Sequence, residues 1–195
     1  MSEANLIFAE FLLAHEPLRY CRFMNYCHGN EEESRPLGHV MDGQGVQMQY
    51  APNSICYGCG PANEKGLRIN SKRSEDGLIM HFTPNEEHQA FPGMINGGII
   101  GSLMDCHGNW AAAIAIMDSR GESEPPCTVT ANYSIKLRRP TPAGVELEVF
   151  AKVVGLEGDK CNVEMTLSAE GKVCATGEGL FVAVKEGHPA YHRWH

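Results

Sequence analysis

The chain has 195 residues, of which 43% are apolar, and its 16 basic and 24 acidic side chains give a formal charge of −8 at pH 7. This composition is typical of one globular domain, and without a block of lysines or arginines it argues against a nucleic-acid partner. No uncharged apolar run reaches the roughly 20 residues of a membrane span, and residues 1–5 lack the basic start of a secretory signal. We therefore expect a cytoplasmic protein.

Residues 1–50 are expected to form an N-terminal extension. A short amphipathic helix is predicted over residues 4–15, and it should end before Pro17 because proline disfavours helical geometry in the preceding residue. The rest of the extension is rich in glycine, proline and acidic residues, which is typical of a polar loop or a covering arm. The domain proper is predicted over residues 51–186, and residues 187–195 are expected to form a C-terminal tail.

The predicted domain contains two strands, one long helix and four further strands. The two short strands lie on either side of a turn at residues 75–77, and the helix spans residues 97–117. The predicted strands occupy residues 66–71, 78–82, 129–137, 145–154, 162–169 and 172–184. Because strands joined by tight turns pair antiparallel, we expect an α+β fold in which a curved antiparallel sheet wraps around one long central helix.

The predicted helix has two different faces when about 100° is turned per residue. One face is bulky and suits the sheet; it holds Ile99, Ile100, Leu103, Met104, His107, Trp110, Ala111, Ile114 and Ala115. The other is small and polar and carries one carboxylate; it holds Gly98, Gly101, Ser102, Asp105, Gly108, Asn109 and Ala112. Since each glycine inside a helix costs about 1 kcal/mol relative to alanine, we expect a ligand or another backbone near this face. The alternative is ordinary helix–helix packing with Asp105 at a solvated rim.

The start of this helix is a candidate oxyanion site. Gly97 and Gly98 offer the first helical amides, which have no partner within the helix and lie at its positive end, so they suit a developing oxyanion. Asn96 either caps the helix or orients a substrate carbonyl or water. Gly98 and Asp105 lie about 10 Å apart along the helix axis. They can act on one carbon only if two antiparallel helices meet across a dimer axis.

Three segments of the chain resemble the hotdog-fold acyl-CoA thioesterase superfamily, in the group that includes the phenylacetyl-CoA-type and thioesterase superfamily member 4-like proteins. Residues 91–98 (FPGMINGG), followed by Asp105, resemble the family's PG-x-x-HGG segment and acid. Residues 56–67 (CYGCGPANEKGL) are similar to its cysteine-containing lead-in. Residues 130–142, which begin TANY and end RPTP, are similar to its strand after the helix. The resemblance covers about residues 53–184.

The resemblance implies a homodimer or homotetramer that hydrolyses an acyl-CoA to a free acid and CoA, without a cofactor. The Gly98 amide would polarise the thioester carbonyl, Asp105 of the facing subunit would be the general base or nucleophile, and Thr130 would position the acid or the water. The family commonly has histidine where this chain has Asn96. A non-catalytic acyl-CoA-binding hotdog protein is therefore the alternative.

Further residues are candidates for substrate binding. Gly97, Phe91 and Asn109 belong to the helix start or its small face, and His88 either lines the pocket or lies on the surface. Lys136, Arg138 and Arg139 form the densest basic cluster, which suits a CoA phosphate or simply protects a sheet edge from aggregation.

The eight cysteines are expected to be reduced, because no secretory signal accompanies them. Cys56 and Cys59 have the spacing of half a tetrahedral zinc site, and only Cys21, Cys27 and His28 lie nearby in the sequence as further ligands. The alternative is a glycine-rich turn whose thiols pack inward. With no second motif to complete the site, we predict no bound metal.

Overall fold

The computed structural model describes residues 44–194, so the helix predicted over residues 4–15 lies outside the described residues. The elements in chain order are α2 (Val46–Tyr50), β1 (Ser71–Ser74), β2 (Gly77–Phe82), the 3-10 helix η3 (Glu86–His88), β3 (Gln89–Phe91), β4 (Met94–Ile95), α3 (Gly97–Arg120), β5 (Thr128–Leu137), β6 (Leu147–Glu157), β7 (Lys160–Ala169) and β8 (Lys172–Ala183). In this part of the chain, no helix is both long and apolar enough to cross a membrane.

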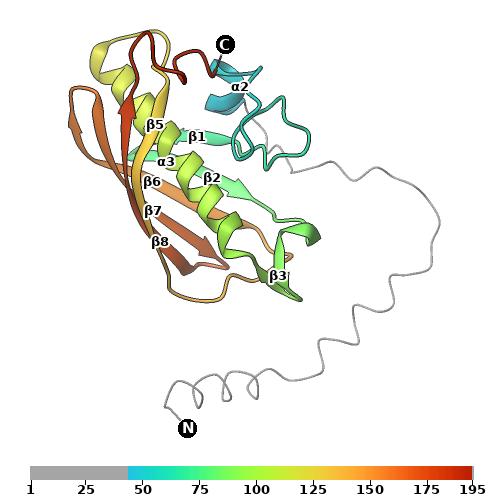
Figure 1. Cartoon of the computed structure of the whole chain (residues 1–195). Coiled ribbons are helices and arrows are strands. Elements are labelled where there is room, and N and C mark those ends of the chain that lie inside the picture. The colour runs from blue at the N-terminus through green and yellow to red at the C-terminus, as the bar shows by residue number, and fades with distance from the viewer. Residues whose placement is uncertain (1–43, 195) are drawn as a thin grey trace. The chain divides into compact units, whose positions relative to one another are not determined.

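The core of the fold is a six-stranded sheet in the order β1-β2-β6-β7-β8-β5, and every neighbouring pair is antiparallel. Strands β3 and β4 form a separate antiparallel pair. Helix α3 lies along one face of the sheet (Figure 1) and packs against β5, β6, β7 and β8. The predicted α+β fold, an antiparallel sheet around one long helix, is confirmed.

Apolar side chains alternate along the strands and meet the bulky face of α3. In β7 the buried residues are Cys161, Val163, Met165, Leu167 and Ala169, with polar or exposed residues between them. Leu103 and Trp110 of α3 are fully buried in the same core. The face predicted to be bulky therefore packs on the sheet, as expected from its helical period.

Two of the glycines predicted on the small face of α3 lie against the sheet instead. A Cβ atom at Gly108 would come within 2.5 Å of the Met165 sulfur and 2.9 Å of the Phe181 ring. A Cβ atom at Gly101 would come within 3.7 Å of the Tyr133 hydroxyl. Gly108 therefore allows close packing of the helix on β7 and β8, and the close approach expected at this glycine is made by side chains of the sheet rather than by a ligand or another backbone.

The first predicted strand was wrong in position. Residues 66–70 are not a strand, and the sheet begins at Ser71, which lies opposite Met80 in β2. The amides of Leu67 and Ile69 donate instead to the carbonyls of Tyr57 (2.7 Å) and Gly58 (3.1 Å). Between them Arg68 has a φ of 51°, a left-handed conformation that a strand cannot contain. Leu67 and Ile69 are both buried, so the sequence has the alternation of a strand, but these residues belong to a loop.

A buried polar chain fixes α2 to the sheet and to α3. Gln47 donates to the Ser71 hydroxyl and accepts from the Ser71 amide, both at 2.8 Å. The Ser71 hydroxyl lies 2.8 Å from Nδ1 of His107, whose Nε2 lies 3.1 Å from the carbonyl of Leu78. Because a carbonyl only accepts, Nε2 carries the proton and Nδ1 accepts from Ser71. Residues 46–50, expected to be irregular, form a helix that is anchored by this network. The domain boundaries predicted at residues 50 and 186 stay predictions.

Candidate active site

Asn96 caps helix α3. Its side-chain Oδ1 accepts a hydrogen bond of 2.7 Å from the backbone amide of Gly98, and its backbone amide donates to the carbonyl of His88 at 2.9 Å. Its extended backbone conformation is the one usual for an N-cap residue. Asn96, Gly97 and Gly98 are all exposed. The amide that we considered for an oxyanion is thus occupied by the Asn96 side chain.

Asp105 is held by Thr130 of the adjacent strand. The Thr130 hydroxyl donates to Oδ1 of Asp105 at 2.7 Å, which links α3 to β5. Burial raises the pKa of Asp105, and the nearby Cys56 thiolate raises it further, while the Thr130 hydrogen bond and the Arg193 guanidinium oppose this change. The result is a half-buried carboxylate with a fixed orientation and a pKa above its ordinary value, which are properties suited to a general base.

His88 supports the start of α3 from the side. Its Nδ1 accepts a hydrogen bond of 2.9 Å from the Asn85 amide, and its ring lies 5.7 Å from that of Phe82 between centroids. Burial lowers the pKa of His88. Phe91, on the neighbouring β3, is 62% exposed. His88 and Phe91 thus belong to the segment just before the helix start, where the His88 carbonyl bonds the Asn96 amide and Phe91 pairs with Met94.

Asn109 has a structural role in this chain. It is 4% exposed, and its Oδ1 accepts from the Thr128 hydroxyl at 2.8 Å and from the Arg193 guanidinium at 2.7 Å. Its carboxamide oxygen is therefore engaged within the protein. The structure does not place this side chain open to a substrate, although it lies on α3 as predicted.

The C-terminal tail contributes contacts that sequence reasoning missed. Trp194 is 3% exposed and stacks on Trp110, with ring centroids 4.3 Å apart and planes 10° apart. Arg193 reaches Asn109 and influences the pKa of Asp105. A tryptophan in an otherwise polar tail was the available signal, because an indole is rarely left in water when a core is within reach.

The predicted basic cluster is divided by the structure. Lys136 and Arg138 line a shallow pocket of about 220 Å³ that also contains Glu164 and Glu178. Arg139 donates instead to the carbonyl of Val173 at 2.7 Å. Along β5, Leu137 reaches the α3 side near Gly97, so its neighbour Lys136 points to the opposite face. Within one chain, Lys136 and Asp105 therefore lie on opposite faces of the sheet.

Cys56 and Cys59 lie beside a third thiol, that of Cys106 in α3. Sequence reasoning did not group them because Cys56 and Cys106 are 50 residues apart. The ligands considered earlier, Cys21, Cys27 and His28, lie outside the described residues.

Among three comparisons with known proteins, only the one with solved structures found matches, and these agree with this architecture. No protein-family model matches the chain, and no curated protein matches it. Among solved structures, a thioesterase superfamily protein from Shewanella loihica PV-4 is 34% identical, and the match covers 64% of this chain and 98% of that one with a TM-score of 0.52.

Two less similar structures share the fold. The E. coli PaaI protein of the phenylacetic acid degradation operon is 20% identical over 64% of this chain and 85% of its own, with a TM-score of 0.53. A thioesterase from Haemophilus influenzae is 16% identical over 63% and 84%, with a TM-score of 0.54. The sheet wrapped around one capped helix is a hotdog fold. The chain belongs to the thioesterase superfamily.

Proposed function

We propose that the protein is an acyl-CoA thioesterase, which hydrolyses an acyl-CoA to a free acid and CoA. The observation that carries the proposal is the Asp105 carboxylate, which lies on the long helix of a thioesterase-superfamily fold and accepts a hydrogen bond of 2.7 Å from Thr130 of β5. Membership of that superfamily supports thioester hydrolysis at the family level. The exposed helix start at Asn96 supplies the polar donors that such a reaction needs.

In the proposed reaction, Asp105 acts as general base or as nucleophile. As a base, it takes a proton from water while the water oxygen attacks the thioester carbonyl carbon; the C–S bond then breaks and the proton passes to the CoA sulfur. As a nucleophile, its oxygen attacks that carbon, the CoA thiolate leaves and takes a proton from solvent, and water then hydrolyses the acyl anhydride. In both cases Thr130 fixes one carboxylate oxygen and leaves the other to react.

We assign the polarisation of the thioester carbonyl to the helix start of a facing subunit. Within one α3 helix, Gly98 and Asp105 are separated by about 10 Å along the axis, which is too far for both to contact one reacting carbon. While Oδ1 of Asn96 accepts from the Gly98 amide, its Nδ2 is a further donor at the same helix start. Asn96 therefore supplies an oxyanion donor directly, beside or instead of the Gly98 amide.

The proposed assembly is an isologous dimer built at β5. This strand is at one end of the sheet order, and it exposes Tyr133 (46%) and Leu137 (58%). An exposed edge strand with apolar side chains is a ready site for pairing with another chain. A two-fold axis there gives two equivalent sites, each combining Asp105 of one subunit with Asn96 and Gly98 of the other.

A second candidate function is acyl-CoA binding without turnover. The observation that favours it is that the Gly98 amide is occupied by the Asn96 side chain, where the resembled family commonly has histidine. A substrate carbonyl that cannot reach this amide would be bound but not polarised.

Release of free thiol from short-chain, long-chain and aryl acyl-CoAs, measured on the wild type and on Asp105→Asn, distinguishes the two functions. We expect turnover by the wild type and a loss of at least about 100-fold in kcat for the variant. Asp76→Asn, which removes an exposed carboxylate at the β1–β2 turn, is the matched control. Calorimetric binding of CoA with no turnover of any thioester would favour the second function instead.

A further inference from the structure

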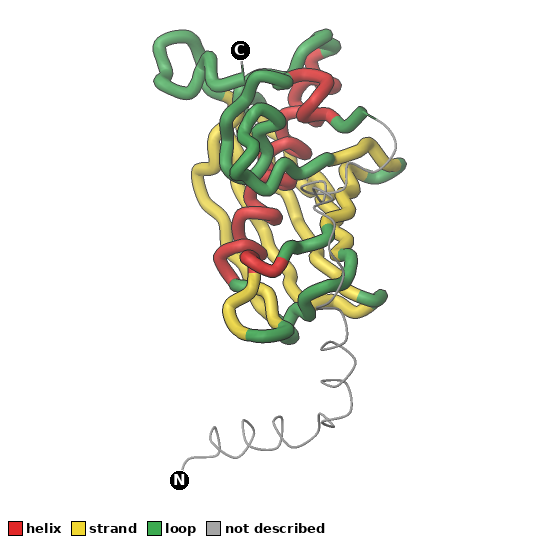
Figure 2. Tube along the Cα trace, turned by 90° about the vertical axis from the view of Figure 1, so that its right-hand side faces the viewer, coloured by secondary structure: helices red, strands yellow, loops and turns green. Residues whose placement is uncertain are grey.

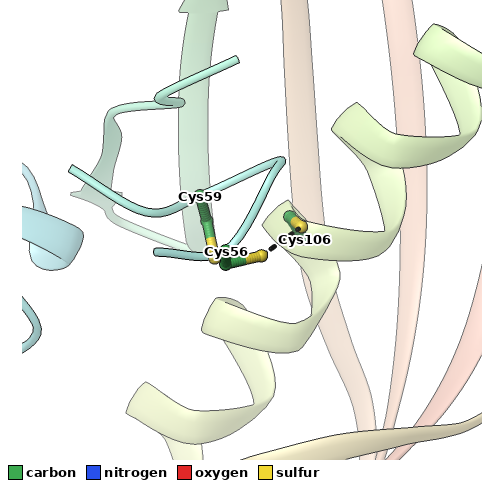
Figure 3. Close-up of side chains that lie close together, drawn as sticks. All are labelled: Cys56, Cys59 and Cys106. Atoms are coloured by element: carbon green, nitrogen blue, oxygen red, sulfur yellow. Dashed lines mark hydrogen bonds between the residues drawn. The ribbon is translucent and has the colours of Figure 1, made fainter. Parts of the chain in front are cut away.

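Three cysteine thiols converge between the loop that precedes β1 and helix α3 (Figure 3). The sulfur atoms of Cys56, Cys59 and Cys106 all lie within 4.8 Å of one another, and those of Cys56 and Cys106 are 3.8 Å apart. Cys59 is buried, whereas Cys56 and Cys106 are partly accessible. No fourth histidine, cysteine, aspartate or glutamate of residues 44–194 joins the group.

The loop that carries Cys56 and Cys59 is fixed tightly against α3. A Cβ atom at Gly58 would lie 2.4 Å from the Cys106 sulfur, so only glycine permits this approach. The turn is closed by a hydrogen bond of 2.8 Å from the Gly60 amide to the Cys56 carbonyl. Figure 2 shows loops, drawn in green, in front of the long helix, with strands of the sheet behind it. The thiols are therefore held in place by backbone on both sides.

The local electrostatics favour a thiolate in this cluster. The pKa of Cys56 is lowered because the Cys106 and Cys59 thiols donate to its sulfur, and the amides of Cys59 and Gly58 add to this effect. The pKa of Cys106 is raised, mainly because its proton is held between Cys56 and Cys59. One sulfur thus accepts hydrogen bonds from two neighbouring thiols.

We infer that Cys56, Cys59 and Cys106 bind one Zn²⁺ ion through three thiolates, with the fourth position taken by water or another small ligand. Tetrahedral zinc with Zn–S bonds of about 2.3 Å separates two ligand sulfurs by about 3.8 Å, which is the distance found between Cys56 and Cys106. A disulfide would require a separation of about 2.05 Å. Thiolate is also the ligand type that zinc accepts most readily in proteins.

The proposed ion ties the loop at residues 56–59 to α3 at the residue that follows Asp105. Its role is to stabilise this junction, and the inference does not depend on thioester hydrolysis. The proposed zinc site replaces the expectation of no bound metal, which was made without knowing that Cys106 lies beside Cys56 and Cys59.

Metal analysis of the full chain tests the site. Protein purified under reducing conditions without chelators is analysed for zinc by mass spectrometry, and the metal-free form is titrated with Co²⁺, whose thiolate charge-transfer bands report sulfur ligation. We expect about one zinc ion per chain. In Cys56→Ser the affinity for Co²⁺ should fall by more than about 100-fold, because loss of a ligand should cost more than the 10- to 100-fold that is typical when a residue supporting a ligand is changed. Cys161→Ser, which changes a buried thiol on β7, should bind like the wild type.

Circular dichroism shows whether each variant is folded, and Cys106→Ser is the second test if Cys56→Ser is not. A wild type that retains no zinc and gives no charge-transfer band with Co²⁺ would overturn the site. So would undiminished binding in folded Cys56→Ser, since the ion would then be held elsewhere in the chain. Thiol counting and an intact mass that show a disulfide among these cysteines in the protein as purified would also overturn it.

Discussion

The Thr130 hydroxyl donates a hydrogen bond of 2.7 Å to Oδ1 of Asp105 and so joins the edge strand of the sheet to the central helix. The interaction fixes the direction of a carboxylate that is half-buried between these two elements. A carboxylate whose second oxygen must meet a water or a carbonyl carbon needs this kind of constraint, because small misorientation is costly for catalysis.

Thr130→Val should lower kcat by roughly 10- to 100-fold, because a hydrogen bond to a charged group contributes about 1.5–3 kcal/mol. Valine has the shape of threonine without its hydroxyl, so KM should change little. Thr130→Ser keeps the donor and should retain most activity. Steady-state kinetics on the best acyl-CoA would test this, and equal rates for the valine and serine variants would remove Thr130 from the mechanism.

Asn96→Asp separates the two roles of Asn96. Asp and Asn cap helices about equally well, so the Gly98 amide keeps its acceptor and the melting temperature should stay unchanged. The variant loses the Nδ2 donor, and loss of one oxyanion donor costs about 100- to 1000-fold in kcat. Asn96→Ala should lose both activity and about 1 kcal/mol of stability. If Asn96→Asp turns over substrate at the wild-type rate, Asn96 is a cap and nothing more.

Much of this fold follows from local patterns. The alternation in β7 and the bulky stripe of α3 are set by the periods of strand and helix, and both predict which side is buried. Asn96 followed by two glycines likewise marks the helix start from the sequence alone. Local pattern failed at Leu67 and Ile69, where alternating burial belongs to a loop hydrogen-bonded to Tyr57 and Gly58.

The site was harder to predict because its contacts join distant segments. The third thiol of the cysteine cluster comes from the helix, and one of the two partners of Asn109 comes from the tail, 84 residues further along the chain. Nor does helical spacing show that Gly108 is needed for the approach of Met165. Such pairings depend on how the sheet and helix pack, and the periodicity of a single helix or strand carries no information about that packing.

The stability of the protein should depend on pH through His88. Burial lowers its pKa below the ordinary value of 6.5, so the unfolded chain binds the proton more readily than the folded one. The contribution of His88 to stability is therefore complete above pH 6.5 and falls as the pH drops toward the folded-state pKa. Protonation of Nδ1 also removes the acceptor of the Asn85 amide.

Urea unfolding of wild type and His88→Gln from pH 7.5 to pH 5 isolates this effect. His107, whose pKa is lowered to about 4 by burial, contributes to both proteins and cancels in the difference. We expect the wild type to lose more stability on acidification than the variant. Parallel curves would show that His88 has the same pKa in both states.

Trp194→Ala should destabilise the domain by about 3 kcal/mol, in the range for removing a buried aromatic side chain. The substitution removes the stack on Trp110 and leaves that ring facing a cavity. Trp194→Phe keeps an aromatic partner and should recover a large part of the loss. Chemical unfolding followed by circular dichroism measures both, and a change below about 0.5 kcal/mol for alanine would mean that the tail does not dock in solution.

We predict that Lys136 and Arg138 bind the nucleotide end of CoA, since both line one pocket on the outer face of the sheet. Glu164 and Glu178 share that pocket, so a bound phosphate must be held by both cations against two carboxylates. Replacing both cations with glutamine should raise KM for an acyl-CoA by about tenfold or more, the value of one charge-assisted hydrogen bond.

The same double variant should leave KM unchanged for the matching acyl-pantetheine, which lacks the nucleotide phosphates. Lys160→Gln, at an exposed position on β7, controls for the loss of positive charge. Because exposed charges are screened, the effect on KM should also weaken as salt is raised. An equal rise in KM for both substrates would place the cations near the acyl group or in the fold rather than at the phosphates, and no rise for either would leave them as charges that protect the sheet edge.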